Sequence, residues 1–92
     1  MKKQVRVVWT GRVQGVGFRY TAEISARALK LVGWVRNLSD GRVEAVCEGP
    51  ENRLKAFLDD VRTGPMQRYI QRVHAEWRDP TGEFDDFGIR FY

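Results

Sequence analysis

Hydrophobic and polar side chains alternate over residues 4–10, QVRVVWT, near the start of the chain. Val5, Val7 and Trp9 fall on one face of this segment, and the residues between them fall on the other. Alternation of this kind indicates a β-strand with one face against a core. Similar β-rich stretches predict further strands at residues 31–38, 42–49, 69–77 and 87–92.

The hydrophobic pattern changes to a helical repeat in two of the intervening segments. We predict a first helix from about Arg19 to Lys30. Its apolar residues at helical spacing are Tyr20, Ile24, Ala28 and Leu31, with Ala22, Ala26 and Leu29 beside them. A second helix begins after Pro50, a residue that suits the start of a helix. Its apolar residues have the spacing i, i+3, i+4, i+7: Leu54, Phe57, Leu58 and Val61.

The order of these elements predicts an α+β fold of the ferredoxin-like type, a split βαβ sandwich with an antiparallel sheet and two helices on one face. Right-handed crossovers favour the same arrangement. Strands 4–10 and 31–38 would then run parallel, with strand 42–49 between them. Their C-terminal ends share one edge of the sheet, so the residues after the first strand and Asn37 are expected there, about 10 Å apart.

A glycine-rich segment, GRVQGVGFR, occupies residues 11–19 between the first strand and the first helix. Glycines let such a loop turn its N–H groups toward an anion, and Arg19 at the helix start adds a planar fork of donors suited to phosphate. The segment lacks the Lys-Ser/Thr of a P-loop and the spacing of a dinucleotide motif. It therefore favours a small phosphate group. Alternatively, the segment is only a structural connection, in which glycine permits a strained turn.

Charge is unevenly distributed along the chain, which has 92 residues and a net charge of +4. Residues 1–46 hold nine basic and three acidic residues, so an anion site is expected in this half. Cys47 is the only cysteine, which excludes an internal disulfide and favours a buried strand residue. No stretch has the length of a signal peptide or membrane span. We expect one domain over residues 1–92, monomeric and cytoplasmic.

Several motifs together resemble the acylphosphatase family. They are GRVQGVGFR (11–19), GWVRN (33–37), DGRVE (40–44), EGP (48–50) and GP (64–65), in order over almost the whole chain. The resemblance implies a ferredoxin-like enzyme that hydrolyses the carboxyl–phosphate bond of small acyl phosphates and releases inorganic phosphate. It also implies that Arg19 binds the phosphate and Asn37 orients the attacking water. The phosphate cradle would be Gln14, Gly15, Val16, Gly17, Phe18 and Arg19.

Lys30 departs from this family pattern, which often has glycine between the two leucines at the end of the first helix. If the backbone is left-handed there, lysine costs about 1 kcal/mol relative to glycine. The departure would affect stability and leave the site unchanged.

The residues near the motifs offer no general acid, general base or metal-ligand cluster. Asn37 can hold a water molecule but cannot deprotonate it, because an amide is not a base. We therefore predict a reaction without metal or cofactor, in which a phosphate oxygen of the substrate takes the proton. His74, the only histidine, is expected on the surface of a strand.

Two other functions remain compatible with the fold. One is a ferredoxin-like module that binds RNA, but RVEAVCEG lacks the aromatic pattern of such domains, so no nucleic acid is expected. The other is a phosphate sensor without turnover, which Asn37 argues against. Domains of this family also occur within larger carbamoyl-transfer enzymes, whereas a chain of 92 residues is expected to act alone.

Overall fold

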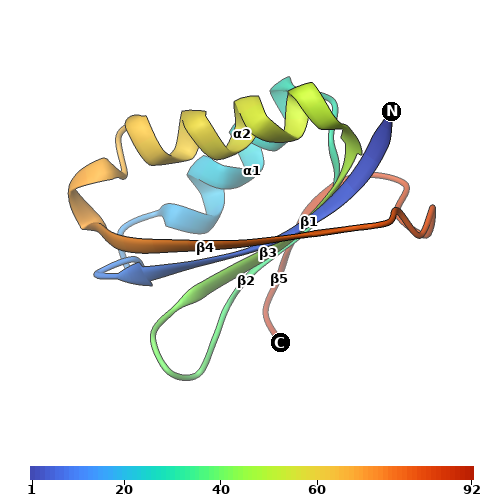
Figure 1. Ribbon diagram of the computed structural model, residues 1–92. Coiled ribbons are helices and arrows are strands. Elements are labelled where there is room, and N and C mark those ends of the chain that lie inside the picture. The colour runs from blue at the N-terminus through green and yellow to red at the C-terminus, as the bar shows by residue number, and fades with distance from the viewer.

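The structure, a computed structural model, describes residues 1–92. Two helices cover one face of a five-stranded sheet and leave the other face open (Figure 1). Its elements, in chain order, are β1 (Lys2–Gly11), α1 (Phe18–Ala28), β2 (Val32–Asn37), β3 (Val43–Pro50), α2 (Glu51–Thr63), the short 3₁₀ helix η1 (Gln67–Tyr69), β4 (Ile70–Arg78) and β5 (Phe87–Arg90). The predicted ferredoxin-like α+β fold is confirmed.

The strand order is β4-β1-β3-β2-β5. β3 lies between β1 and β2 and runs antiparallel to both, as the sequence predicted. β4 pairs antiparallel with the outer edge of β1. β5 adds a parallel strand beside β2, an arrangement that the hydrophobic pattern alone did not indicate.

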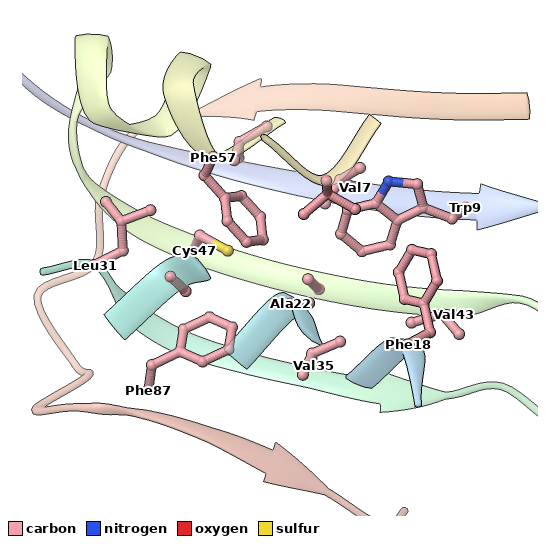
Figure 2. Packing of buried hydrophobic residues seen from close by; sticks show 14 of the residues in the cluster. Val7, Trp9, Phe18, Ala22, Leu31, Val35, Val43, Cys47, Phe57 and Phe87 are labelled. Atoms are coloured by element: carbon pink, nitrogen blue, oxygen red, sulfur yellow. The ribbon is translucent and has the colours of Figure 1, made fainter. Parts of the chain in front are cut away.

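The core lies between the sheet and the helices, where side chains from both layers interdigitate (Figure 2). Val5, Val7 and Trp9 are fully buried, which confirms the predicted inner face of β1. The Trp9 and Phe18 rings lie 5.0 Å apart at a tilted angle, a favourable geometry for two aromatic side chains. Cys47 is buried as expected, and this burial raises the pKa of its thiol.

The apolar face predicted for α1 is wrong in part, at Tyr20 and Ile24. Tyr20 is 63% exposed and Ile24 is 52% exposed, whereas Phe18, Ala22 and Ala26 are buried. These three residues have an i, i+4, i+8 spacing, which also forms one face of a helix. The small alanines let α1 lie close to the sheet, and the larger Tyr20 and Ile24 point outward.

Helix α1 ends in a Schellman motif that forces Lys30 into the left-handed region. The Leu31 N–H donates to the Ala26 carbonyl at 2.9 Å and the Lys30 N–H donates to the Arg27 carbonyl at 3.0 Å. Lys30 is the only residue other than glycine with positive φ, at 57°. The backbone at Lys30 is therefore left-handed, and lysine is expected to cost about 1 kcal/mol of stability there relative to glycine.

Candidate active site

The glycine-rich loop is held between fixed ends. β1 finishes in a bulge at Gly11, whose φ is 142° and where a Cβ would clash with the Tyr69 carbonyl. The next residue, Arg12, donates its N–H to that carbonyl at 2.9 Å. Val13 is fully buried in the core, as is nearly all of Phe18 at the start of α1. The segment between Val13 and Phe18 is therefore anchored at both ends.

Within the loop, Gly15 and Gly17 both have left-handed backbones, with φ of 77° and 80°. A Cβ at either position would meet nothing within 4 Å, so the backbone conformation and not the space requires glycine here. The intervening Val16 has no positive φ. Alternation of this kind turns successive N–H groups toward one side and forms an anion-binding nest.

The N–H groups of this loop and of the first turn of α1 are unpaired. No other protein group accepts a hydrogen bond from the backbone N–H groups of residues 14–20. Gly17 is the N-cap and offers no side chain for capping. A row of free donors at a helix N-terminus is a favourable place for a negatively charged oxygen group.

Arg19 lies in the first turn of α1, beside these donors, and is half-buried. It forms no ion pair, and its guanidinium makes no hydrogen bond to the protein. The guanidinium carbon lies 5.1 Å from the centre of the Phe91 ring, a cation–π contact that leaves the N–H groups free. Arg19 can therefore donate a planar pair of hydrogen bonds to a phosphate bound at the loop.

Gln14 joins the loop to the hairpin between β2 and β3. Its Nε2 donates to the Leu38 carbonyl at 2.7 Å and to the Arg42 carbonyl at 3.0 Å. The loop and the Asn37 corner thus lie at the same edge of the sheet, where the sequence placed them. Because the Gln14 side chain is used in this contact, its backbone N–H is the group that remains for a ligand.

Asn37 is the last residue of β2 and pairs with Val43 at the start of β3. Its side-chain amide makes no hydrogen bond to the protein, although the residue is only half-exposed. The turn that follows is fixed by Asp40, whose carboxylate accepts from the Arg42 N–H at 3.1 Å and from Nε at 2.8 Å. A positioned but unpaired amide can hold a water molecule.

The C-terminal residues complete this edge, although no motif in the sequence pointed to them. Phe91 and Tyr92 line a shallow hollow together with Asn37, and Phe91 also contacts Arg19. The Tyr92 main-chain oxygen accepts a hydrogen bond from Arg36 Nη1 at 3.0 Å. An aromatic pair just after the last strand was the available signal, but only the parallel pairing of β5 with β2 brings it to Asn37.

Arg36 is also part of the GWVRN motif, but it is already paired with a carboxylate. Its Nε lies 2.8 Å from Glu44, and Arg6 Nε lies 2.6 Å from the other carboxylate oxygen. Burial alone would raise the pKa of Glu44, but the hydrogen bonds from Arg36 and Arg6 outweigh it and lower that pKa. Arg19 therefore remains as a cation without an acidic partner beside the loop.

Other features of the chain add little to this site. No cluster of three or more His, Cys, Asp or Glu side chains could hold a metal ion. No helix is both long and apolar enough to cross a membrane. His74 is exposed, as predicted, and lies on the open face of the sheet 3.3 Å from Glu76.

Known proteins match this chain over most of its length. The acylphosphatase family model matches residues 5–89. An acylphosphatase of Anaeromyxobacter dehalogenans is 46% identical over 88 residues, which cover 96% of this chain and 95% of that protein. The crystal structure of acylphosphatase from Bacillus subtilis has a TM-score of 0.90 and 40% identity, and the match covers 99% of this chain and 100% of that one.

A larger protein contains a similar unit. The crystal structure of full-length HypF in the phosphate- and nucleotide-bound form has a TM-score of 0.85 and 25% identity. The match covers 98% of this chain but only 12% of that one. Together with the full-length matches, these findings confirm both the family that the motifs resemble and the expected hydrolase class. The chain belongs to the acylphosphatase family.

Proposed function

We propose that this chain hydrolyses small acyl phosphates to a carboxylate and inorganic phosphate, without a metal or cofactor. The phosphate would bind to the backbone N–H groups of residues 14–19, which are Gln14, Gly15, Val16, Gly17, Phe18 and Arg19. The Arg19 guanidinium would bind the same group. One observation carries the proposal: a row of unpaired N–H donors lies next to an arginine without an acidic partner.

The reaction would consist of one displacement at phosphorus. A water held by the Asn37 amide forms a new O–P bond while the bond from phosphorus to the acyl oxygen breaks. The carboxylate leaves with the electron pair of that bond and needs no general acid. The proton of the water passes to a phosphate oxygen, because the Asn37 amide cannot accept it and the Asp40 carboxylate in the adjacent turn is already held by Arg42.

The protein would contribute mainly charge stabilisation and positioning. Phosphoryl transfer passes through a loose transition state with charge on the equatorial oxygens. Backbone N–H groups and a guanidinium held in place before reaction stabilise such charge without having to reorganise. The contact of Arg19 with Phe91, and the bonds from Gln14 to the hairpin, support this geometry.

The decisive experiment compares Arg19→Ala and Asn37→Ala in a steady-state assay with a generic acyl phosphate and a chelator. We expect Arg19→Ala to raise KM and weaken competition by inorganic phosphate, and Asn37→Ala to lower kcat about 100-fold or more with little change in KM. Asn52→Ala and Arg62→Ala, which change exposed residues of α2, are matched controls. Near-normal turnover by both site variants would contradict the assignment.

The same assay separates an enzyme from a phosphate sensor. A sensor would bind phosphate through the loop without turning over the acyl phosphate, and Asn37→Ala would leave its binding unchanged. We further propose that residues 1–92 act as one domain, as a cytoplasmic monomer. Size-exclusion chromatography with light scattering would test the oligomeric state.

A further inference from the structure

A second basic hollow lies at the opposite end of the sheet from the glycine-rich loop. It has a volume of about 570 Å³ and lies where β1 begins and where β3 passes into α2, at the N-terminal end of the chain in Figure 1. The connection between β4 and β5 forms its remaining wall. We propose that this hollow binds a small polyphosphate group, independently of the active site.

Three basic side chains from different parts of the fold line the hollow: Lys2, Lys30 and Arg53. None of them forms an ion pair with the protein. Glu51, the acidic residue in the first turn of α2, is already bound by Lys55 at 3.0 Å. That hydrogen bond is the main cause of the lowered pKa of Glu51. The basic groups therefore remain available to an anion from solution.

Glu48 is the only acidic residue in the lining, and its carboxylate is fully occupied. One oxygen accepts from Gln4 Nε2 at 2.6 Å and from Thr81 N and Oγ1 at 2.8 and 2.9 Å. The other oxygen accepts from Gly82 N at 3.0 Å. These bonds hold Glu48 as part of the wall and tie the β4–β5 connection to β3. The basic side chains outnumber this single acid, so the hollow keeps a net positive charge.

Lys30 is the most informative of the basic residues. It occupies the left-handed position of the Schellman motif, with φ of 57°, where glycine would be unstrained. Strained residues persist where the surrounding structure holds them, and they are concentrated at functional sites. In this protein the strained residue is Lys30, and it lines the hollow together with Lys2 and Arg53.

The start of α2 adds further donors to the same hollow. The Glu51 N–H is taken by the Met1 carbonyl at 3.0 Å, but the N–H groups of Asn52 and Arg53 have no acceptor in the protein. The N-terminus of this 13-residue helix also carries a partial positive charge. Pro50 and Arg53 both line the hollow, so these donors lie at its rim.

The size and charge of the hollow select the ligand class. A volume of about 570 Å³ lies within the range of small-molecule sites and exceeds what one phosphate needs. The three basic side chains that line it can donate charge-assisted hydrogen bonds to two or three linked phosphate groups. Phe84 also lines the hollow and offers an apolar surface for a ring attached to such a chain. Tripolyphosphate and ATP share the chemistry that this site would recognise.

Binding is best measured in an Arg19→Ala background, which removes the phosphate-binding arginine of the active site. We expect titration calorimetry with tripolyphosphate to show one site, and amide shifts in NMR to concentrate at residues 2, 30, 50–53 and 81–84. Adding Lys30→Gly should weaken binding about tenfold, while relief of backbone strain raises Tm by about 4 °C. Loss of binding therefore cannot be attributed to unfolding.

Controls define what would overturn the proposal. Arg62→Ala removes a basic residue from the far end of α2 and should change the affinity less than about twofold. Unchanged affinity after both Lys30→Gly and Arg53→Ala would refute the site, as would shifts confined to residues 14–19. ATP distinguishes the two sources of the ligand. If ATP binds more tightly than tripolyphosphate and Phe84→Ala abolishes the difference, the ligand is a nucleotide. If the two bind equally, the ligand is an inorganic chain.

Discussion

The glycine-rich loop and the open face of the sheet are both rich in polar groups, but these groups have partners within the protein only on the open face. Along residues 14–20 the backbone donors have no partners, and Arg19 has no acid. On the open face, the nearly buried Glu44 accepts from Arg6 and Arg36. Glu48 is likewise saturated by its neighbours. The donors of the loop lack partners in the protein, whereas the carboxylates of the open face are paired with neighbouring donors.

This difference separates groups that stabilise the fold from groups available to a ligand. A buried carboxylate without partners would destabilise the protein, so Glu44 and Glu48 must be matched within the chain. The loop donors are at the surface, where water satisfies them until an anion replaces it. Two arginines of the same chain thus differ in role: Arg36 is held by Glu44, whereas Arg19 is held only by the ring of Phe91.

The largest effect that tests this comparison is expected from glycine substitutions. Gly15 and Gly82 have nearly equal φ, 77° and 73°, and a Cβ added at either position would meet nothing within 4 Å. Backbone strain should cost each variant about 1 kcal/mol of stability, and Gly82→Ala loses somewhat more because the Gly82 N–H also holds Glu48. Only Gly15→Ala turns the loop donors away, and we expect it to lower kcat/KM about 100-fold. Equal activities of the two variants would contradict a role of the loop donors in catalysis.

A smaller effect, on stability, is expected from a substitution of Glu44 on the open face of the sheet. Glu44→Gln keeps the size of the side chain but leaves Arg36 without an anion and Arg6 with Glu76 alone, at 3.3 Å. We expect a loss of about 2 kcal/mol in the free energy of unfolding, less than for a fully buried pair because both arginines remain partly exposed. Urea denaturation measures this loss, and kcat/KM of the folded variant should stay within about tenfold of the parent. A stable variant without activity would instead place Glu44 in the site.

The smallest effect concerns the acid stability of the same region. Hydrogen bonds from Arg36 and Arg6 outweigh the effect of burial and lower the pKa of Glu44 below its ordinary value of 4.5. A lowered pKa in the folded state stabilises the protein above about pH 5, and this contribution is lost as the pH falls through the folded value. Between pH 6 and pH 3, the stability of Glu44→Gln should fall less steeply than that of the parent. Parallel curves for the two proteins would show that Glu44 contributes nothing to the acid transition.

The helical and strand segments could be predicted from the chain because their hydrophobic periods are local. Trp9 on the inner face of β1 and Leu54 on α2 followed directly from the spacing of apolar residues. The inner face of α1 could not be chosen in this way. The apolar residues formed a broad band, and close packing of Ala22 and Ala26 against the sheet left Tyr20 and Ile24 exposed.

The candidate site divides in the same manner. Local sequence predicted a glycine-rich turn over residues 11–19 before a helix, since glycine adopts the left-handed backbone seen at Gly15 and Gly17 without steric cost. Ferredoxin-like topology also placed Asn37 at the same edge, because two parallel strands around a third end together.

The tertiary structure alone decided the contacts that join distant parts of the chain. It brought Gln14 to the hairpin carbonyls and Phe91 to Arg19, and it left the donors of residues 14–20 without partners. Sequence determines which groups each segment carries and the period that forms it. Which of those groups are satisfied depends on neighbours far away in the chain, and only the packed structure brings these together.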